Sequence, residues 1–96
     1  MTKARKVPRP FEMPWARGQI IEEAAYTGPH HDACIQLMRY DDGDAAGTLA
    51  VRFCSYDHSG RFQRNPLIVS EATIAGLRVA LNSAPRLRTL LRKLVV

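Results

Sequence analysis

Two segments in which apolar and polar residues alternate constrain the fold of this chain more than any other feature. In residues 33–40 and 49–56, apolar and polar side chains alternate at almost every position. This is the period of two expected of a half-buried β-strand. The loop between them, residues 41–47, is polar and contains two glycines, as in a β-hairpin. The pattern therefore predicts an antiparallel hairpin.

The register of this hairpin determines which side chains share a face. If Tyr40 faces Thr48 across the loop, antiparallel counting places Cys34 opposite Cys54. One face then carries the aliphatic and aromatic residues Ile35, Leu37, Leu49, Val51 and Phe53, and the other carries Gln36, Tyr40, Arg52 and Tyr56. We expect the first of these faces to form the core.

The remaining segments predict an α+β fold. Residues 19–26 fit a first strand or a helix equally well, and residues 66–69 fit a short final strand. Ser70 is a suitable helix N-cap, with Glu71 in the first turn of the helix. We expect one antiparallel sheet of about four strands, followed by a helical segment that is broken near Pro85.

The beginning of the chain differs from the rest in composition. Residues 1–18 contain three prolines and five basic residues, which predicts an extended, mobile arm. Residues 19–96 form one domain, because 96 residues are too few for two cores. Net charge is +4 over residues 1–17, −5 over residues 18–60 and +6 over residues 61–96. This polarity favours a polyanionic partner, of which nucleic acid is the first candidate.

Catalytic and metal-binding motifs have little support in this sequence. The three histidines and two cysteines fit no metal-ligand spacing, and no glycine-rich phosphate loop or nucleophile motif is present. We therefore expect no enzyme activity, cofactor, metal or small-molecule substrate. The chain has no signal-peptide pattern and no apolar run of membrane-spanning length, so we expect no membrane partner and a cytoplasmic location with reduced cysteines.

Two surfaces are candidates for binding. Unpaired bases stack on aromatic rings while guanidinium groups contact phosphates, which selects Arg39, Tyr40, Arg52, Tyr56, Arg61 and Arg64 as nucleic-acid-binding candidates; the alternative is an ordinary solvated sheet face. Leu87, Leu90, Leu91 and Leu94 form a stripe at helical spacing. This stripe belongs either to the core of one chain or to the shared core of a homodimer.

The order and spacing of these parts resemble a known family. The run Thr48-Leu49-Ala50-Val51-Arg52-Phe53-Cys54-Ser55-Tyr56-Asp57-His58-Ser59-Gly60, a basic stretch, Leu67-Ile68-Val69-Ser70-Glu71 and a helix ending Leu91-Arg92-Lys93-Leu94 are similar to the Positive Cofactor Four family of transcriptional coactivators. That family includes small bacterial members and binds single-stranded DNA. The resemblance covers roughly residues 35–96. It implies a curved sheet, a homodimer with paired helices, and nucleic-acid contacts through Arg39, Tyr40, Arg52 and Arg64.

The sequence thus predicts a non-enzymatic protein that binds single-stranded DNA, or RNA, in transcription or DNA maintenance. The loop residues Asp41, Asp42 and Asp44 are acidic where the family is usually basic. This departure keeps open an alternative, a protein-interaction or assembly domain of the same fold that does not bind nucleic acid.

Overall fold

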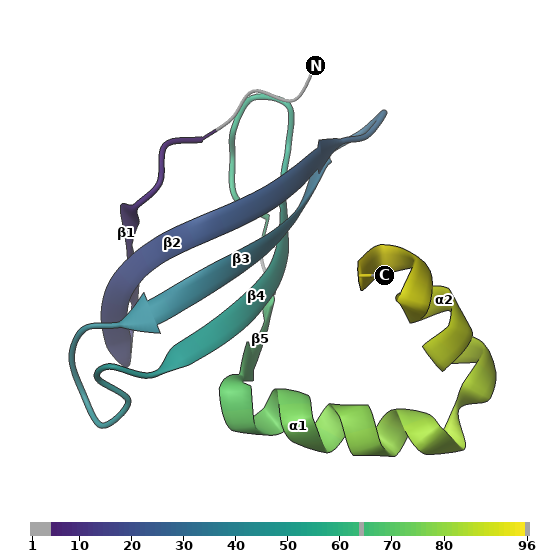
Figure 1. The fold of residues 1–96 in the computed structure, drawn as a ribbon. Coiled ribbons are helices and arrows are strands. Elements are labelled where there is room, and N and C mark those ends of the chain that lie inside the picture. The colour runs from purple at the N-terminus through teal and green to yellow at the C-terminus, as the bar shows by residue number, and fades with distance from the viewer. Residues whose placement is uncertain (1–4, 64, 96) are drawn as a thin grey trace.

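A computed structural model of the chain describes residues 5–63 and 65–95 and shows an α+β fold (Figure 1). The strands are β1 (Arg9–Met13), β2 (Ala16–Thr27), β3 (Asp32–Tyr40), β4 (Leu49–Tyr56) and β5 (Leu67–Ser70). They form one antiparallel sheet in the order of the sequence. The helices α1 (Glu71–Ala80) and α2 (Pro85–Val95) follow, joined by one turn of 3-10 helix at Leu81–Ser83.

The predicted hairpin is confirmed in its register and in the bounds of β4, while β3 begins one residue earlier than predicted, at Asp32. Cys34 pairs with Cys54, and the backbone N–H of Tyr40 donates to the carbonyl of Thr48 at 3.0 Å. Gly47 closes the loop with a φ of +83°, a conformation that residues with a Cβ rarely adopt. A polar loop with glycine at this position therefore fixes how β3 and β4 pair.

The start of the sheet corrects the prediction of a mobile arm over residues 1–18. Residues 9–13 form β1, and β2 already begins at Ala16, so the sheet has five strands and the expected boundary at residue 18 falls inside β2. Pro10 is compatible with this strand because β1 lies at the edge of the sheet, where a residue without an N–H is tolerated. Residues 1–4 of the expected arm lie outside the described part of the chain.

Gly18 shows why β1 and β3 can lie so close to β2. A Cβ at this position would stand 2.0 Å from the carbonyl oxygen of Arg39 and 2.9 Å from the ring of Phe11. Only glycine fits there. The sheet can therefore bring Phe11 against its centre, where the Phe11 and Tyr40 rings meet edge to face at 5.7 Å.

The buried face of the sheet is the reverse of the one we expected. The two predicted sets of side chains do lie on opposite faces, but the face that carries Gln36, Tyr40, Arg52 and Tyr56 is buried. The aliphatic face is half exposed, with Phe53 at 42%. Phe11, Arg5 and Phe62 cover the polar face, whereas neither helix has a buried residue that could cover the other face.

The helical segment follows the sequence signals closely. The hydroxyl of Ser70 accepts a hydrogen bond from the backbone N–H of Thr73 at 3.2 Å, as expected of an N-cap. The break occurs at the predicted place, since α2 begins at Pro85. Figure 1 shows α1 extending from the end of β5 and α2 turning back at its far end. No helix among the described residues is long and apolar enough to cross a membrane.

Candidate nucleic-acid interface

Gln36 is the centre of the polar sheet face. Its side chain is fully buried and uses both ends of its amide. The amide nitrogen donates to the Glu23 carboxylate at 2.6 Å and to the Tyr56 hydroxyl at 3.1 Å, while the amide oxygen accepts from Nε of Arg52 at 2.7 Å. One glutamine on β3 thus joins a side chain of β2 to two side chains of β4.

Arg9 completes this network from β1. Its guanidinium donates to both oxygens of Glu23, at 3.3 and 2.8 Å, and to the Tyr56 hydroxyl at 3.3 Å. Burial raises the pKa of Glu23, but hydrogen bonds from Arg9 and Gln36 and the charges of Arg9 and Arg5 outweigh it, so the pKa lies below its ordinary value. Glu23 is therefore held as a carboxylate within the sheet.

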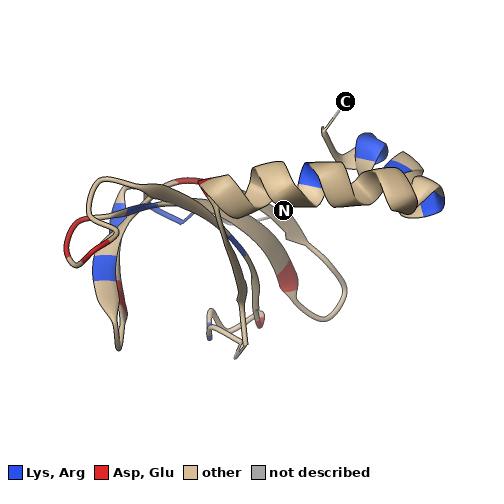
Figure 2. Ribbon diagram, turned by 90° about the horizontal axis from the view of Figure 1, so that it is seen from below, with Lys and Arg blue, Asp and Glu red and all other residues tan. Residues whose placement is uncertain are grey.

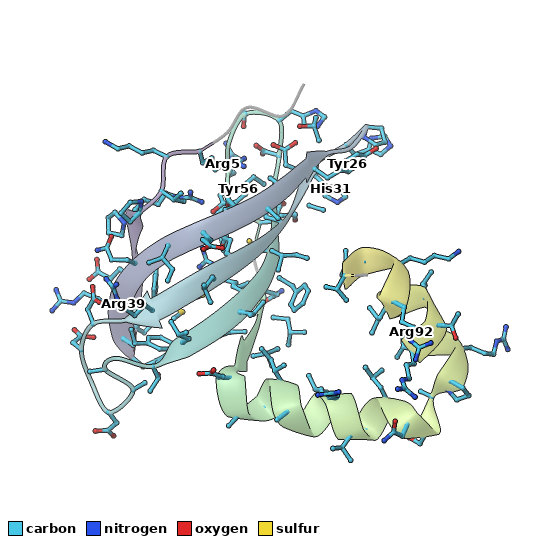
Figure 3. All side chains as sticks on the ribbon, in the orientation of Figure 1. Arg5, Tyr26, His31, Arg39, Tyr56 and Arg92 are labelled. Atoms are coloured by element: carbon cyan, nitrogen blue, oxygen red, sulfur yellow. The ribbon has the colours of Figure 1, made fainter. Side chains whose placement is uncertain are left out.

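Arg5 covers the far end of the same face (Figure 3). Its guanidinium carbon lies 3.9 Å from the centre of the Tyr56 ring, and its Nη2 donates to Asp32 at 3.3 Å. On another side, the Tyr56 ring meets Phe62 edge to face at 5.4 Å. Tyr56 is consequently only 8% exposed.

Arg52 is buried among the same groups. It is 7% exposed, and its guanidinium lies over the Phe62 ring at 4.7 Å in addition to its bond to Gln36. This arrangement stabilises a buried guanidinium through its hydrogen bond to Gln36 and a cation–π contact, with Cys54 as a further side-chain partner.

The predicted binding residues therefore divide into two groups. Tyr40, Arg52 and Tyr56 lie on one face of the sheet, as predicted, but they are buried there and do not face solvent. Arg39 and Arg61 are exposed, the first at the β3 end of the hairpin (Figure 3) and the second in the loop after β4. Arg64 lies outside the described residues.

Exposed groups near the hairpin were missed by the sequence reasoning. Trp15 is 62% exposed, and its ring lies 5.6 Å from that of Tyr40. Arg17 has a 67% exposed side chain and pairs with Asp42 at 3.1 Å, while Arg39 pairs with Asp41 at 3.3 Å. The turn between β1 and β2 brings Trp15 and Arg17 to the hairpin. The sequence did not predict this turn, because residues 1–18 were interpreted as an arm.

The cysteine and histidine side chains do not assemble a metal site. Among residues 5–63 and 65–95, no three His, Cys, Asp or Glu side chains are grouped to hold an ion. Burial, with a smaller effect of the Glu23 charge, raises the pKa of Cys34 to about 11, so this thiol is protonated at neutral pH and a weak nucleophile.

A second, apolar surface extends from the sheet to the helices. Leu87, Leu90, Leu91 and Leu94 are 38–61% exposed, and α1 adds Ile74 and Leu77. A cavity of about 430 Å³ lies between the aliphatic sheet face and Leu94. Residues 5–63 and 65–95 therefore leave the predicted stripe on α2 outside any core of the same chain.

Comparisons with known proteins do not assign the chain to a family: no protein-family model, curated protein or solved structure matches it. The likeness to the Positive Cofactor Four family stays a prediction.

Proposed function

We propose that this protein is a non-enzymatic, single-stranded nucleic-acid-binding module that acts as a homodimer in transcription or DNA maintenance in the bacterial cytoplasm. The observation that carries the proposal is the distribution of exposed charge. Helix α2 bears four basic side chains and no acidic one, and all four are exposed. Blue bands mark these positions on the helix in Figure 2. Exposed Arg39 and Arg61 add positive charge at the sheet. Such clusters attract phosphate groups and favour nucleic-acid binding.

Base contacts follow from the aromatic groups beside these cations. Trp15 offers an exposed ring in the turn that leads to Arg17, and a base stacked on it would lie at the hairpin end of the sheet. Tyr40 lies beneath Trp15 as its support. Tyr56 and Arg52 are covered, so their predicted contacts to nucleic acid require Arg5 and Phe62 to move.

The homodimer is supported by the uncovered apolar surface. The four leucines of α2 and the aliphatic sheet face together exceed the scattered apolar residues that a monomer ordinarily exposes. A second copy would cover the stripe on α2 with its own. The resemblance to the Positive Cofactor Four family implies that the curved sheets of such a dimer form the nucleic-acid surface.

A second candidate function is an assembly or protein-interaction domain without nucleic-acid binding. It is favoured by the acidic hairpin, where Asp41 and Asp42 already pair with the two exposed arginines of this end. A nucleic acid must displace these carboxylates before it can reach the guanidinium groups.

A titration with labelled oligonucleotides separates the two functions. The protein is mixed with single-stranded and duplex DNA of equal length, and fluorescence anisotropy is followed at several salt concentrations. We expect tighter binding of the single strand, and quenching of Trp15, which is the only tryptophan in the chain. A dimer that binds neither DNA would support the assembly domain, and preference for duplex would contradict base stacking.

A further inference from the structure

Arg5 contacts three different groups on the polar sheet face. The flat side of its guanidinium lies 3.9 Å from the centre of the Tyr56 ring. One edge donates to Asp32 at 3.3 Å, and Nη1 points to the sulfur of Cys34 at 3.9 Å. A planar group with several donors can make all three contacts at once, whereas the compact ammonium group of a lysine cannot.

The groups that receive Arg5 belong to the sheet itself. Tyr56, Asp32 and Cys34 lie on β3 and β4 and are each at most 9% exposed. The Tyr56 hydroxyl is fixed independently by Gln36 and Arg9. These two hydrogen bonds hold the Tyr56 ring in place whether or not Arg5 is present, and Asp32 and Cys34 are positioned by the backbone of β3. We refer to Tyr56, Asp32 and Cys34 as the arginine pocket.

The segment that carries Arg5 is less firmly held than the pocket. Residues 5–8 belong to no strand, and the Arg5 side chain is 21% exposed. A neighbouring cavity of about 450 Å³ is lined by Arg5, Lys6 and Asp32 together with the loop from Asp57 to Gly60. The pocket is thus open on the side from which Arg5 enters.

Asp32 has unused capacity for a basic ligand. Its Oδ2 receives Arg5, but its buried Oδ1 has no hydrogen-bond partner among the described residues. The nearest cationic candidate, Nε2 of His58, stands 3.9 Å away and already contacts the carbonyl of Gly28 at 3.0 Å. A buried carboxylate oxygen without a donor favours a ligand that brings further N–H groups.

We propose that the arginine pocket is a recognition site for an extended, arginine-containing basic segment of a protein partner, and that Arg5 occupies it in the free chain. Charge and shape both select this ligand, because an aromatic ring and a carboxylate together bind a guanidinium in the way Arg5 is bound. The site shares Tyr56 with the predicted nucleic-acid contacts, but its ligand is a guanidinium group, so the inference does not depend on nucleic-acid binding. A partner segment enters by displacing Arg5.

The test uses the full-length Arg5→Ala variant, in which the pocket is vacant. The ligand is the tripeptide acetyl-Ala-Arg-Lys-amide, and acetyl-Ala-Lys-Lys-amide serves as the matched control. NMR signals of the Tyr56 ring, assigned with Tyr56→Phe, report binding directly and without nucleic acid. We expect saturable shifts with a Kd in roughly the millimolar range for the arginine peptide, and at least about tenfold weaker binding of the lysine peptide.

Two further variants locate the contact. Adding Asp32→Asn to Arg5→Ala should weaken arginine-peptide binding about tenfold, whereas adding Asp44→Asn, which alters an exposed carboxylate of the β3–β4 loop, should leave it unchanged. If Arg5→Ala does not fold, the unmodified protein is titrated with the same peptide, and the Arg5 side-chain signals should lose the shift caused by the Tyr56 ring. Equal affinity for both peptides, or no change at Tyr56 up to about ten times the expected Kd, would overturn the proposal.

Discussion

Replacing Gln36 with leucine should destabilise the protein strongly, although the two side chains have similar size. The substitution removes the 2.7 Å bond to Arg52 and the 2.6 Å bond to Glu23. A hydrogen bond to a charged group contributes roughly 1.5–3 kcal/mol. Glu23 and the Tyr56 hydroxyl keep Arg9 as a partner, but Nε of the buried Arg52 loses its acceptor. Leucine also gains about 1–2 kcal/mol from burial of its apolar surface, so we expect a net loss of about 3 kcal/mol.

Urea denaturation followed by far-UV circular dichroism measures this loss as a change in the free energy of unfolding. Met38→Leu is the matched control, because Met38 is also fully buried, two residues away on the same face of β3. A volume-conserving change between apolar residues should cost less than about 1.5 kcal/mol. Both variants are compared at one protein concentration, so that a change in association does not enter. If Gln36→Leu unfolds within about 1 kcal/mol of Met38→Leu, the network does not stabilise the sheet as argued.

Three other predictions test the charges and the apolar stripe. The pKa of Glu23 in the folded protein lies below the ordinary 4.5. Its contribution to the free energy of unfolding is therefore complete above pH 4.5 and is lost as pH falls through the folded pKa. The midpoint of thermal unfolding should fall more steeply with acid in the parent than in Glu23→Gln, and equal sensitivity would refute this. Leu90→Glu with Leu94→Glu should convert a dimer to an 11 kDa monomer in light scattering, whereas Arg88→Gln, off the stripe, should not; a parent protein that is already monomeric would contradict the dimer. Arg39→Ala should weaken single-strand binding and flatten the plot of log affinity against log salt by about 0.7, and an unchanged slope would remove Arg39 from the phosphate contacts.

Local signals in the sequence determined much of the fold. The polar loop and the alternation around it were sufficient to place β4 at residues 49–56 and to pair Cys34 with Cys54. Ser70 and Pro85 marked the two helix starts because capping and the missing N–H of proline act within one turn of the chain. These features depend on neighbours in the sequence, which is why they could be predicted.

Contacts between distant segments could not be predicted in the same way. Alternation separates two faces of a strand, but it does not say which one is covered. Here Arg5, Phe11 and Phe62 reach the polar face from elsewhere in the chain. Arg52 and Tyr56 therefore looked like solvent-facing binding groups, although their partners bury them.

The two faces of this sheet are satisfied in different ways. At its centre the polar face is satisfied within one chain, since Arg9 and Gln36 donate hydrogen bonds to Glu23 and to Tyr56. The apolar face and the α2 stripe are not covered by any described segment of the same chain. Loss of the proposed dimer should therefore expose apolar surface without removing the hydrogen bonds that join β1 to β4. A dissociated Leu90→Glu, Leu94→Glu protein that keeps the far-UV spectrum of its strands would show that the sheet is stable without pairing. A fully unfolded one would show that the polar network is insufficient on its own.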